Sequence, residues 1–448
     1  MNDGSPAVLP VVREYDPAMP LYFTNSHVRY FEYLKGRLVG TVEHYPVIII
    51  GGGPAGLFCA AAAAGAGQCV LLLEKMPLCG KKLLITGSGQ CNLTHDGDIS
   101  DFFSKYGDHG PFLRPSLRKF SNHDLMKWFS ERGLALNTDE SGKVFPQSRR
   151  ASDVLSVLLE SCRDAGVFFR CGEAVRDAGV SAGGFHVRTE KSLYESEVLV
   201  IATGGASYPD TGSTGDGFSL ASALSHRIVP ISPALVPIRV MDYPFPDLAG
   251  ISFDGLAFSL YRDGKKIRDV RGDLLFTHAG LSGPGILHLS RYIMPDDTLT
   301  ISFLPGMRQE MLKKDLVGRM AASGTKQVKS ILSGYSLPAR FITRLLEMIG
   351  IPPELTGAHL PKKERDELVR LLSAFPLRIL GPGGWDEAMV TRGGVSLEEV
   401  NPDTMESLLV PHLYFIGEVL DIDGDTGGYN LQAAFSTAMA AAIALSSR

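Results

Sequence analysis

The sequence lacks the main signatures of several large classes of protein. It has no uninterrupted apolar run of about 18 residues, so we expect no transmembrane helix and no membrane partner. Its net charge of −5 gives no general reason to expect a nucleic-acid partner. Residues 1–45 lack the apolar core and cleavage site of a secretory signal, and we interpret them as an N-terminal extension without a functional signal. These absences favour a cytoplasmic protein.

Metal-binding and disulfide patterns are also missing. The six cysteines include no Cys-x-x-Cys pair and no paired histidine spacing, which excludes a recognisable zinc site or disulfide framework and favours reduced thiols. Asp421, Asp423 and Asp425 alternate as they would in a calcium loop, but no glutamate occupies the twelfth position of that loop. We therefore predict no metal site.

The most informative stretch that is present spans residues 47–58. A β-branched run at 47–50 leads into Gly51, Gly53 and Gly56, and an alanine-rich helix follows. A strand, a glycine turn and a helix form the context in which Gly-x-Gly-x-x-Gly indicates a dinucleotide site. The helix N-terminus, with its free amides and positive dipole end, then faces the pyrophosphate. We predict that this stretch binds an adenine dinucleotide.

A second apolar run at 69–73 ends in Glu74, 18 residues beyond Gly56. An acid at about this spacing accepts hydrogen bonds from the ribose of the dinucleotide. The following loop, 79–94, combines a lysine pair with a Gly-Ser-Gly turn and small polar residues. By itself it is typical of a surface loop, but its position after the ribose-binding strand favours contact with the rest of the cofactor.

The remaining chain alternates between two kinds of pattern. Residues 46–205 are typical of an α/β layer, and the strand at 197–201 leads into a second glycine turn at Gly204, at the sheet edge where ligands bind. Residues 206–385 are typical of antiparallel β structure with a charged helical excursion at about 307–375. The α/β pattern returns at 386–448. We predict one discontinuous α/β domain with a β-rich insertion.

Several motifs together resemble a known family. They are the glycine stretch at 47–56, the segments 80–87, 91–94, 277–284 and 388–395, and above all the run at 417–432. This combination resembles bacterial NAD(P)/FAD-dependent oxidoreductases of the aminoacetone-oxidase-like and bile-acid 4,6-reductase-like type. The resemblance implies a glutathione-reductase-like FAD-binding Rossmann domain, interrupted by a β-barrel-like domain with a helical insertion.

The resemblance also implies how FAD is bound. The pyrophosphate would lie on the glycine turn and the ribose on Glu74, while the loop from Gly87 and the last helix N-terminus would enclose the flavin. A helix N-terminus suits the negative charge of a reduced flavin. The implied cofactor-binding residues are Gly51, Gly53, Ala55, Gly56, Glu74, Lys75, Lys82, Gly87, Gln90, Cys91, Asn92, Thr94, Gly204, Thr391, Gly417, Glu418, Asp425, Gly428, Tyr429, Asn430 and Leu431.

One departure from the family pattern concerns the flavin loop. The family usually has arginine where this chain has Gln90, so a cationic contact is missing there. Two residues are candidates for catalysis. Cys91 is the reactive-looking side chain nearest the predicted ring, although a packing role is the alternative. His278 ends a strand of the insertion, and a hydrogen-bonded structural histidine is its alternative.

We expect an FAD-dependent oxidoreductase that moves a hydride through flavin N5 to or from a small organic substrate, such as an enone or another carbonyl compound. NADH or NADPH would be a transient donor, because no second dinucleotide motif predicts a separate nicotinamide domain. The alternatives are a flavin-dependent oxidase, and a flavoprotein whose FAD supports partner or RNA binding. The acidic net charge argues against RNA. Substrate, donor and oligomeric state stay open.

Overall fold

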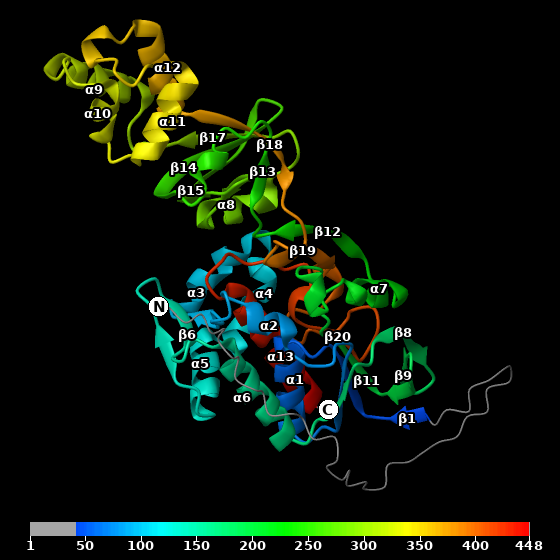
Figure 1. Ribbon diagram of the computed structural model, residues 1–448. Coiled ribbons are helices and arrows are strands. Elements are labelled where there is room, and N and C mark those ends of the chain that lie inside the picture. Colours follow the sequence, from blue (N-terminus) through cyan, green and yellow to red (C-terminus); the bar gives the residue numbers. More distant parts are fainter. Residues whose placement is uncertain (1–41, 448) are drawn as a thin grey trace, which may run out of the picture.

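The computed structural model describes residues 42–447 and has three tiers (Figure 1). An α/β unit contains both described ends of the chain, a β-barrel stands on it, and a helical unit stands on the barrel. Of the predicted extension 1–45, residues 1–41 lie outside the described part. Within it, Val42–His44 form strand β1, which pairs in parallel with β10 (Leu193–Ser196).

The α/β unit is built on a parallel sheet in the order β20-β11-β2-β3-β7. Its central strands are continuous Val, Ile and Leu runs, as expected for strands that helices cover on both faces. β2 and β11 are buried at every position. The strand bounds are Val47–Ile50 (β2), Val70–Glu74 (β3), Phe168–Cys171 (β7), Val198–Ile201 (β11) and Leu413–Phe415 (β20).

Helices and small sheets surround this layer. Helix α1 packs against α13 and α6, and Phe58 of α1 contacts the Phe435 ring of α13 with centroids 5.1 Å apart. The helices are α1 (Pro54–Gly65), α2 (Lys81–Ile85), α3 (Ile99–Phe102), α4 (Gly110–Lys119), α5 (Asn122–Glu131), α6 (Ala151–Asp164), α7 (Asp216–Ala223) and α13 (Tyr429–Ser446). The other strands here are β4 (Thr94–His95), β5 (Leu136–Thr138), β6 (Lys143–Pro146), β8 (Val175–Ser181) and β9 (Gly184–Thr189).

The second tier is a closed barrel in the order β13-β16-β15-β14-β17-β18. Alternation of buried and exposed residues along β14 and β18 gives each strand one face toward the barrel core. The strands are β13 (Ile238–Val240), β14 (Ser252–Arg262), β15 (Lys265–Phe276), β16 (Gly280–Ser282), β17 (Thr298–Ser302) and β18 (Phe375–Pro382), with helix α8 (Pro284–Leu289) after β16.

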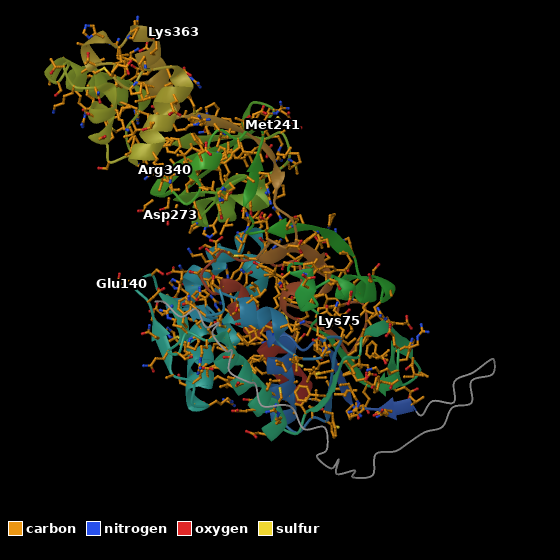
Figure 2. All side chains as sticks on the ribbon, viewed as in Figure 1. Lys75, Glu140, Met241, Asp273, Arg340 and Lys363 are labelled. Carbon is orange, nitrogen blue, oxygen red and sulfur yellow. The ribbon has the colours of Figure 1, made fainter. Side chains whose placement is uncertain are left out.

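The third tier is the helical excursion predicted at 307–375. Phe341 of this unit contacts Phe303 and Phe253, so its core is continuous with that of the barrel. Figure 2 shows Asp273 in the barrel and Lys363 on the helical unit, far from Lys75 of the α/β unit. The helices are α9 (Gln309–Ala322), α10 (Val328–Ser333), α11 (Ala339–Ile349) and α12 (Lys362–Ser373).

The boundary of the insertion differs from its expected place at 206. Helix α7 contributes Phe218 and Leu220 to the core of the α/β unit, whereas the barrel core begins at Ile238. The antiparallel pair of β12 (Ile228–Ala234) and β19 (Val390–Val395) joins the two tiers. Among residues 42–447, the structure has no helix that is both long and apolar enough to cross a membrane.

Candidate active site

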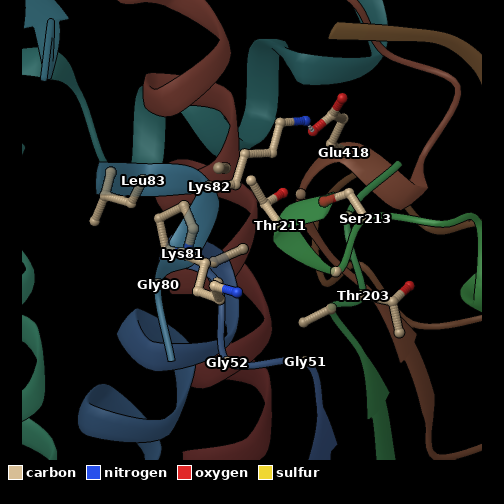
Figure 3. A pocket seen from close by; sticks show the side chains of 18 of the residues that line it. Gly51, Gly52, Gly80, Lys81, Lys82, Leu83, Thr203, Thr211, Ser213 and Glu418 are labelled. Carbon is tan, nitrogen blue, oxygen red and sulfur yellow. Dashed lines mark hydrogen bonds and ion pairs between the residues drawn. The ribbon is translucent and has the colours of Figure 1, made fainter. Parts of the chain in front are cut away.

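A long cavity crosses the α/β unit from the glycine turn to the N-terminus of α13 (Figure 3). It holds about 1440 Å³ of space when the open solvent at its mouth is included. The predicted residues that line it come from six separate segments. They are Gly51, Gly53, Ala55, Glu74, Lys75, Lys82, Gly204, Gly417, Glu418, Asn430 and Leu431.

At one end of the cavity, helix α1 meets strand β2 closely. A β-carbon on Gly56 would lie 1.9 Å from the Gly51 carbonyl oxygen, so only glycine permits this approach. Gly51 itself has a φ of +112° and lies against the backbone of Ala202. Gly53 faces open space, because a β-carbon added to it would have no other atom within 4 Å. The first amides of α1 therefore stand clear at the cavity wall, where a pyrophosphate fits.

Glu74 ends β3 beside this turn. Its Oε2 accepts a hydrogen bond from the Gly52 amide at 2.7 Å, and its Oε1 accepts one from the Met76 amide at 2.7 Å. Burial raises the pKa of the Glu74 carboxyl, and the two amides partly offset that effect. The carboxylate is thus fixed in place on the cavity wall, with remaining lone pairs for ribose hydroxyls.

The loop before α7, which was not predicted as part of the site, lies at the same end of the cavity. Lys75 pairs with Asp216 at 2.6 Å and also donates to Thr214, so the loop before α7 is tied to the end of β3. Thr211, Ser213 and Asp216 line the cavity. The signal in the sequence was the Gly-Ser-Thr-Gly-Asp-Gly run, whose small residues allow close approach to a ligand.

At the other end of the cavity, toward α13, the wall contains a network of polar side chains. Lys82 Nζ lies 2.7 Å from Glu418 Oε2, although the two residues are 336 positions apart. Glu418 Oε1 accepts from the Thr391 amide at 2.9 Å and from Ser207 Oγ at 3.1 Å. Thr391 Oγ1 in turn accepts from the Ala206 amide at 2.7 Å. Figure 3 shows Lys82 and Glu418 joined across the cavity.

The loop at 421–430, which adds Ile422 and Asn430 to the wall, is held by the barrel tier. Arg291 pairs with Asp423 at 2.8 Å and with Asp425 at 3.0 Å, and the Arg291 and Asp423 side chains are each less than 10 % exposed. The imidazole Nε2 of His288 accepts from the Thr426 amide at 3.2 Å. Burial lowers the pKa of His288, which keeps it neutral and able to accept. No motif in the sequence pointed to His288 or Arg291.

Other predicted residues do not line the cavity but contact the segments that do. Gly428 caps α13 and packs on the backbone of Thr94. The Asn92 amide, in the orientation that satisfies both its ends, donates to the Thr94 carbonyl and accepts from the Gly428 amide. The predicted residues outside the lining are Gly56, Gly87, Gln90, Cys91, Asn92, Thr94, Thr391, Asp425, Gly428 and Tyr429.

The cation missing at Gln90 is supplied from another segment. Arg149 donates to Gln90 Oε1 at 3.3 Å and stacks over the Phe145 ring, with 4.0 Å from its guanidinium carbon to the ring centroid. Arg149 has a φ of +55°, a conformation that non-glycine residues adopt rarely. The predicted flavin loop therefore has a guanidinium beside it.

The two catalytic candidates lie away from the cavity wall. Cys91 is fully buried and burial raises its thiol pKa to about 12, which suits the packing role more than a reactive thiolate. His278 is exposed in the turn between β15 and β16, where the Thr277 amide donates to the Gly280 carbonyl. Neither residue is among those that line the cavity.

Comparison with known proteins identifies the family to which the chain belongs. The model of the HI0933-like protein Rossmann domain matches residues 45–444. The chain belongs to this family. It is an FAD-dependent oxidoreductase, and the glycine turn, Glu74 and the long cavity fit that cofactor.

Two relatives of known activity match almost their whole length. The chain is 32% identical to the 3-dehydro-bile acid delta(4,6)-reductase of Clostridium scindens, over 89% of this chain and 98% of that protein. It is also 32% identical to the ribosomal RNA dihydrouridine synthase of Escherichia coli, over 90% of this chain and 98% of that protein. Among solved structures, the 3-ketosteroid dehydrogenase of Rhodococcus jostii has a TM-score of 0.45 at 15% identity, covering 89% of this chain and 97% of that one.

Proposed function

We propose that this protein reduces a carbon–carbon double bond that is conjugated to a carbonyl group, with NADH or NADPH as the electron donor. One observation carries the proposal. Both relatives at 32% identity are named for reactions of this type, since a 3-oxo-4,6-diene and the uracil ring of uridine are both conjugated carbonyl systems. The shared chemistry therefore concerns an enone-like group rather than one particular molecule.

Bound FAD, once reduced by NADH or NADPH, would supply the hydride of this reaction. The chain must then bind the substrate carbonyl and stabilise the negative charge that develops on its oxygen. Arg392 is suited to this task, because strand alternation places it on the same face of β19 as Val390, which lines the cavity. Its guanidinium donates to the Arg291 carbonyl and faces the Tyr292 ring of the barrel tier. Arg392 thus contacts the barrel tier from a strand that also contributes Val390 to the cavity wall.

The matching experiment is anaerobic stopped-flow spectroscopy on the yellow holoprotein. We expect NADH or NADPH to bleach the flavin absorbance, and a 3-oxo-4-ene steroid to restore it. The matched saturated ketone should not restore it. Rapid return of colour with air alone, together with stoichiometric peroxide, would instead establish an oxidase. An Arg392→Met variant should bleach normally but lose at least about tenfold in the rate of the second step.

A specific observation favours a uridine in RNA as the second candidate substrate. Residues 307–375 contain twelve lysines and arginines against seven aspartates and glutamates, a net charge of +5 in a chain whose total is −5. The helical unit is therefore positively charged although the whole chain is acidic. A cationic surface of this kind can bind the phosphate backbone of RNA. Binding of ribosomal RNA that weakens steeply with salt, and that Lys362→Glu with Lys363→Glu removes, would support this substrate over a small enone.

A further inference from the structure

Two cysteines that are 92 positions apart in the sequence meet beside the FAD cavity. Cys79 lies in the loop after β3 and Cys171 ends β7, and their Sγ atoms are 3.7 Å apart. Cys79 is buried, whereas Cys171 is exposed. A disulfide requires an S–S distance of about 2.0 Å, so the two sulfurs need to approach by only about 1.7 Å. We propose that Cys79 and Cys171 form a reversible disulfide in response to peroxide, and that this bond weakens the hold on FAD.

The backbone around the pair is already fixed at short range. Cys171 stands opposite Glu74 in the register of β3 and β7. The Gly172 amide donates to the Met76 carbonyl at 2.9 Å, which ties the loop before Cys79 to the end of β7. The two thiols therefore stay close without a covalent bond between them.

The two thiols differ in the way a redox pair requires. The hydrogen bond with Cys171, together with burial, raises the pKa of Cys79, whereas the same hydrogen bond lowers the pKa of Cys171. Exposed Cys171 is thus the thiolate that reacts first. Its sulfur attacks one peroxide oxygen, which gives a sulfenic acid and releases water. Cys79 then attacks that sulfur and expels a second water. Together the two thiols lose two electrons and two protons, and one peroxide becomes two waters.

The link to the cofactor follows from the position of Cys79, and this part rests on the FAD placement proposed above. Cys79 Sγ would lie 2.6 Å from a β-carbon on Gly52, so it packs directly against the Gly52 backbone. The Gly52 amide holds Glu74, and the Gly52 carbonyl accepts from Gly80 at 2.9 Å. A sulfur drawn toward β7 leaves Gly52 without this support. We expect FAD to dissociate about tenfold faster, the effect of losing one hydrogen bond to a charged group.

The test is to treat the holoprotein with hydrogen peroxide and map its tryptic peptides without reduction. Residues 76–81 and 171–176 form separate peptides with one cysteine each, so a linked pair two hydrogens lighter than the sum identifies the bond directly. Cys79→Ser and Cys171→Ser should each abolish the linked pair. Cys69→Ser, which removes another exposed thiol, should retain it. Free Cys79 beside an over-oxidised Cys171 would overturn the proposal.

The second readout is the rate of FAD release, followed by flavin fluorescence, before and after peroxide and again after dithiothreitol. A rate that rises and is then restored supports the proposal, and an unchanged rate in fully linked protein overturns its functional half. The peptide map depends on neither substrate nor donor, so it stands if the enone reductase assignment fails. If Glu74→Gln leaves FAD affinity intact, the fault lies in the cofactor placement instead.

Discussion

The two ends of the long cavity are built in different ways. The end at α1 consists mainly of backbone, with glycines that permit close approach, free helix amides, and a carboxylate held by the Gly52 and Met76 amides. The end at α13 consists of side-chain pairs that join distant segments, such as Lys82 with Glu418 and Arg291 with Asp423. The first kind of site is local in sequence, and the second exists only after the tiers have packed.

This difference predicts how each end fails. The contact between Gly51 and Gly56 has no room for an added atom, so a single methyl group on Gly56 should abolish the first end. In a network of side chains, each single substitution removes only part of the stabilising free energy, because the remaining contacts persist. The second end should therefore weaken gradually as side chains are removed. The largest expected effect is therefore at a glycine.

Gly56→Ala should give a protein that does not retain FAD. Its β-carbon would lie 1.9 Å from the Gly51 carbonyl oxygen, so strand and helix must separate and the α1 amides lose their position. Gly65→Ala is the matched control in the same helix, because nothing lies within 4 Å of its β-carbon and alanine is the better helix former, by up to about 1 kcal/mol. The flavin-to-protein absorbance ratio after gel filtration measures both. Full flavin content in Gly56→Ala would refute the backbone account of this end.

Arg291→Met should be the most damaging change at the other end. It leaves Asp423 and Asp425 without their shared cation, and removing one partner of a buried pair costs about 3 kcal/mol or more. Burial already raises the pKa of Asp423, so the bare carboxyl would protonate more readily. Thermal unfolding followed by flavin fluorescence measures the loss. Adding Asp423→Asn to this variant should recover part of the lost stability. Arg262→Met, which breaks the ion pair with Asp297 inside the barrel tier, is the comparison that shows whether losing any such pair has the same effect.

The same contrast explains what the sequence could predict. The glycine turn, the α1 helix and Glu74 follow one another within 28 residues, and local rules placed them correctly. The antiparallel β class of the insertion followed from its strand pattern, whereas the barrel was implied by the family resemblance, and its closure rests on the pairing of β13 with both β16 and β18. His288 and Arg291 carry no local motif, because their partners Thr426 and Asp423 lie 138 and 132 positions away in a loop with a different pattern. His278, only ten residues earlier, had the clearer motif and lies in an exposed turn.

Substitutions of Lys82 and Glu418 should weaken FAD binding by a smaller amount, and the effect of each should depend on whether the other residue is present. Lys82→Met or Glu418→Gln alone should weaken FAD binding, because each leaves a mostly buried polar partner without its counter-charge. The double variant should lose less than the sum, with a coupling of about 1–3 kcal/mol. Titration of each apoprotein with FAD gives the four affinities of the cycle. Strict additivity would show that the two side chains contact the cofactor independently.

The smallest expected effect is a pH dependence at the backbone end. Burial raises the pKa of Glu74, so its carboxyl takes up a proton at a higher pH than an ordinary glutamate does. Ribose hydroxyls donate to the ionised form, so FAD affinity should fall as pH drops through that raised pKa, by at most about tenfold per pH unit, and level off above it. FAD titrations between about pH 4.5 and 7.5 measure the slope. Glu74→Gln should bind more weakly at neutral pH and show a flat profile, because the amide keeps one acceptor but cannot ionise. A variant that retains the slope would assign the titration to another group, and the carboxylate would then be a support for the Gly52 and Met76 amides rather than a ribose ligand.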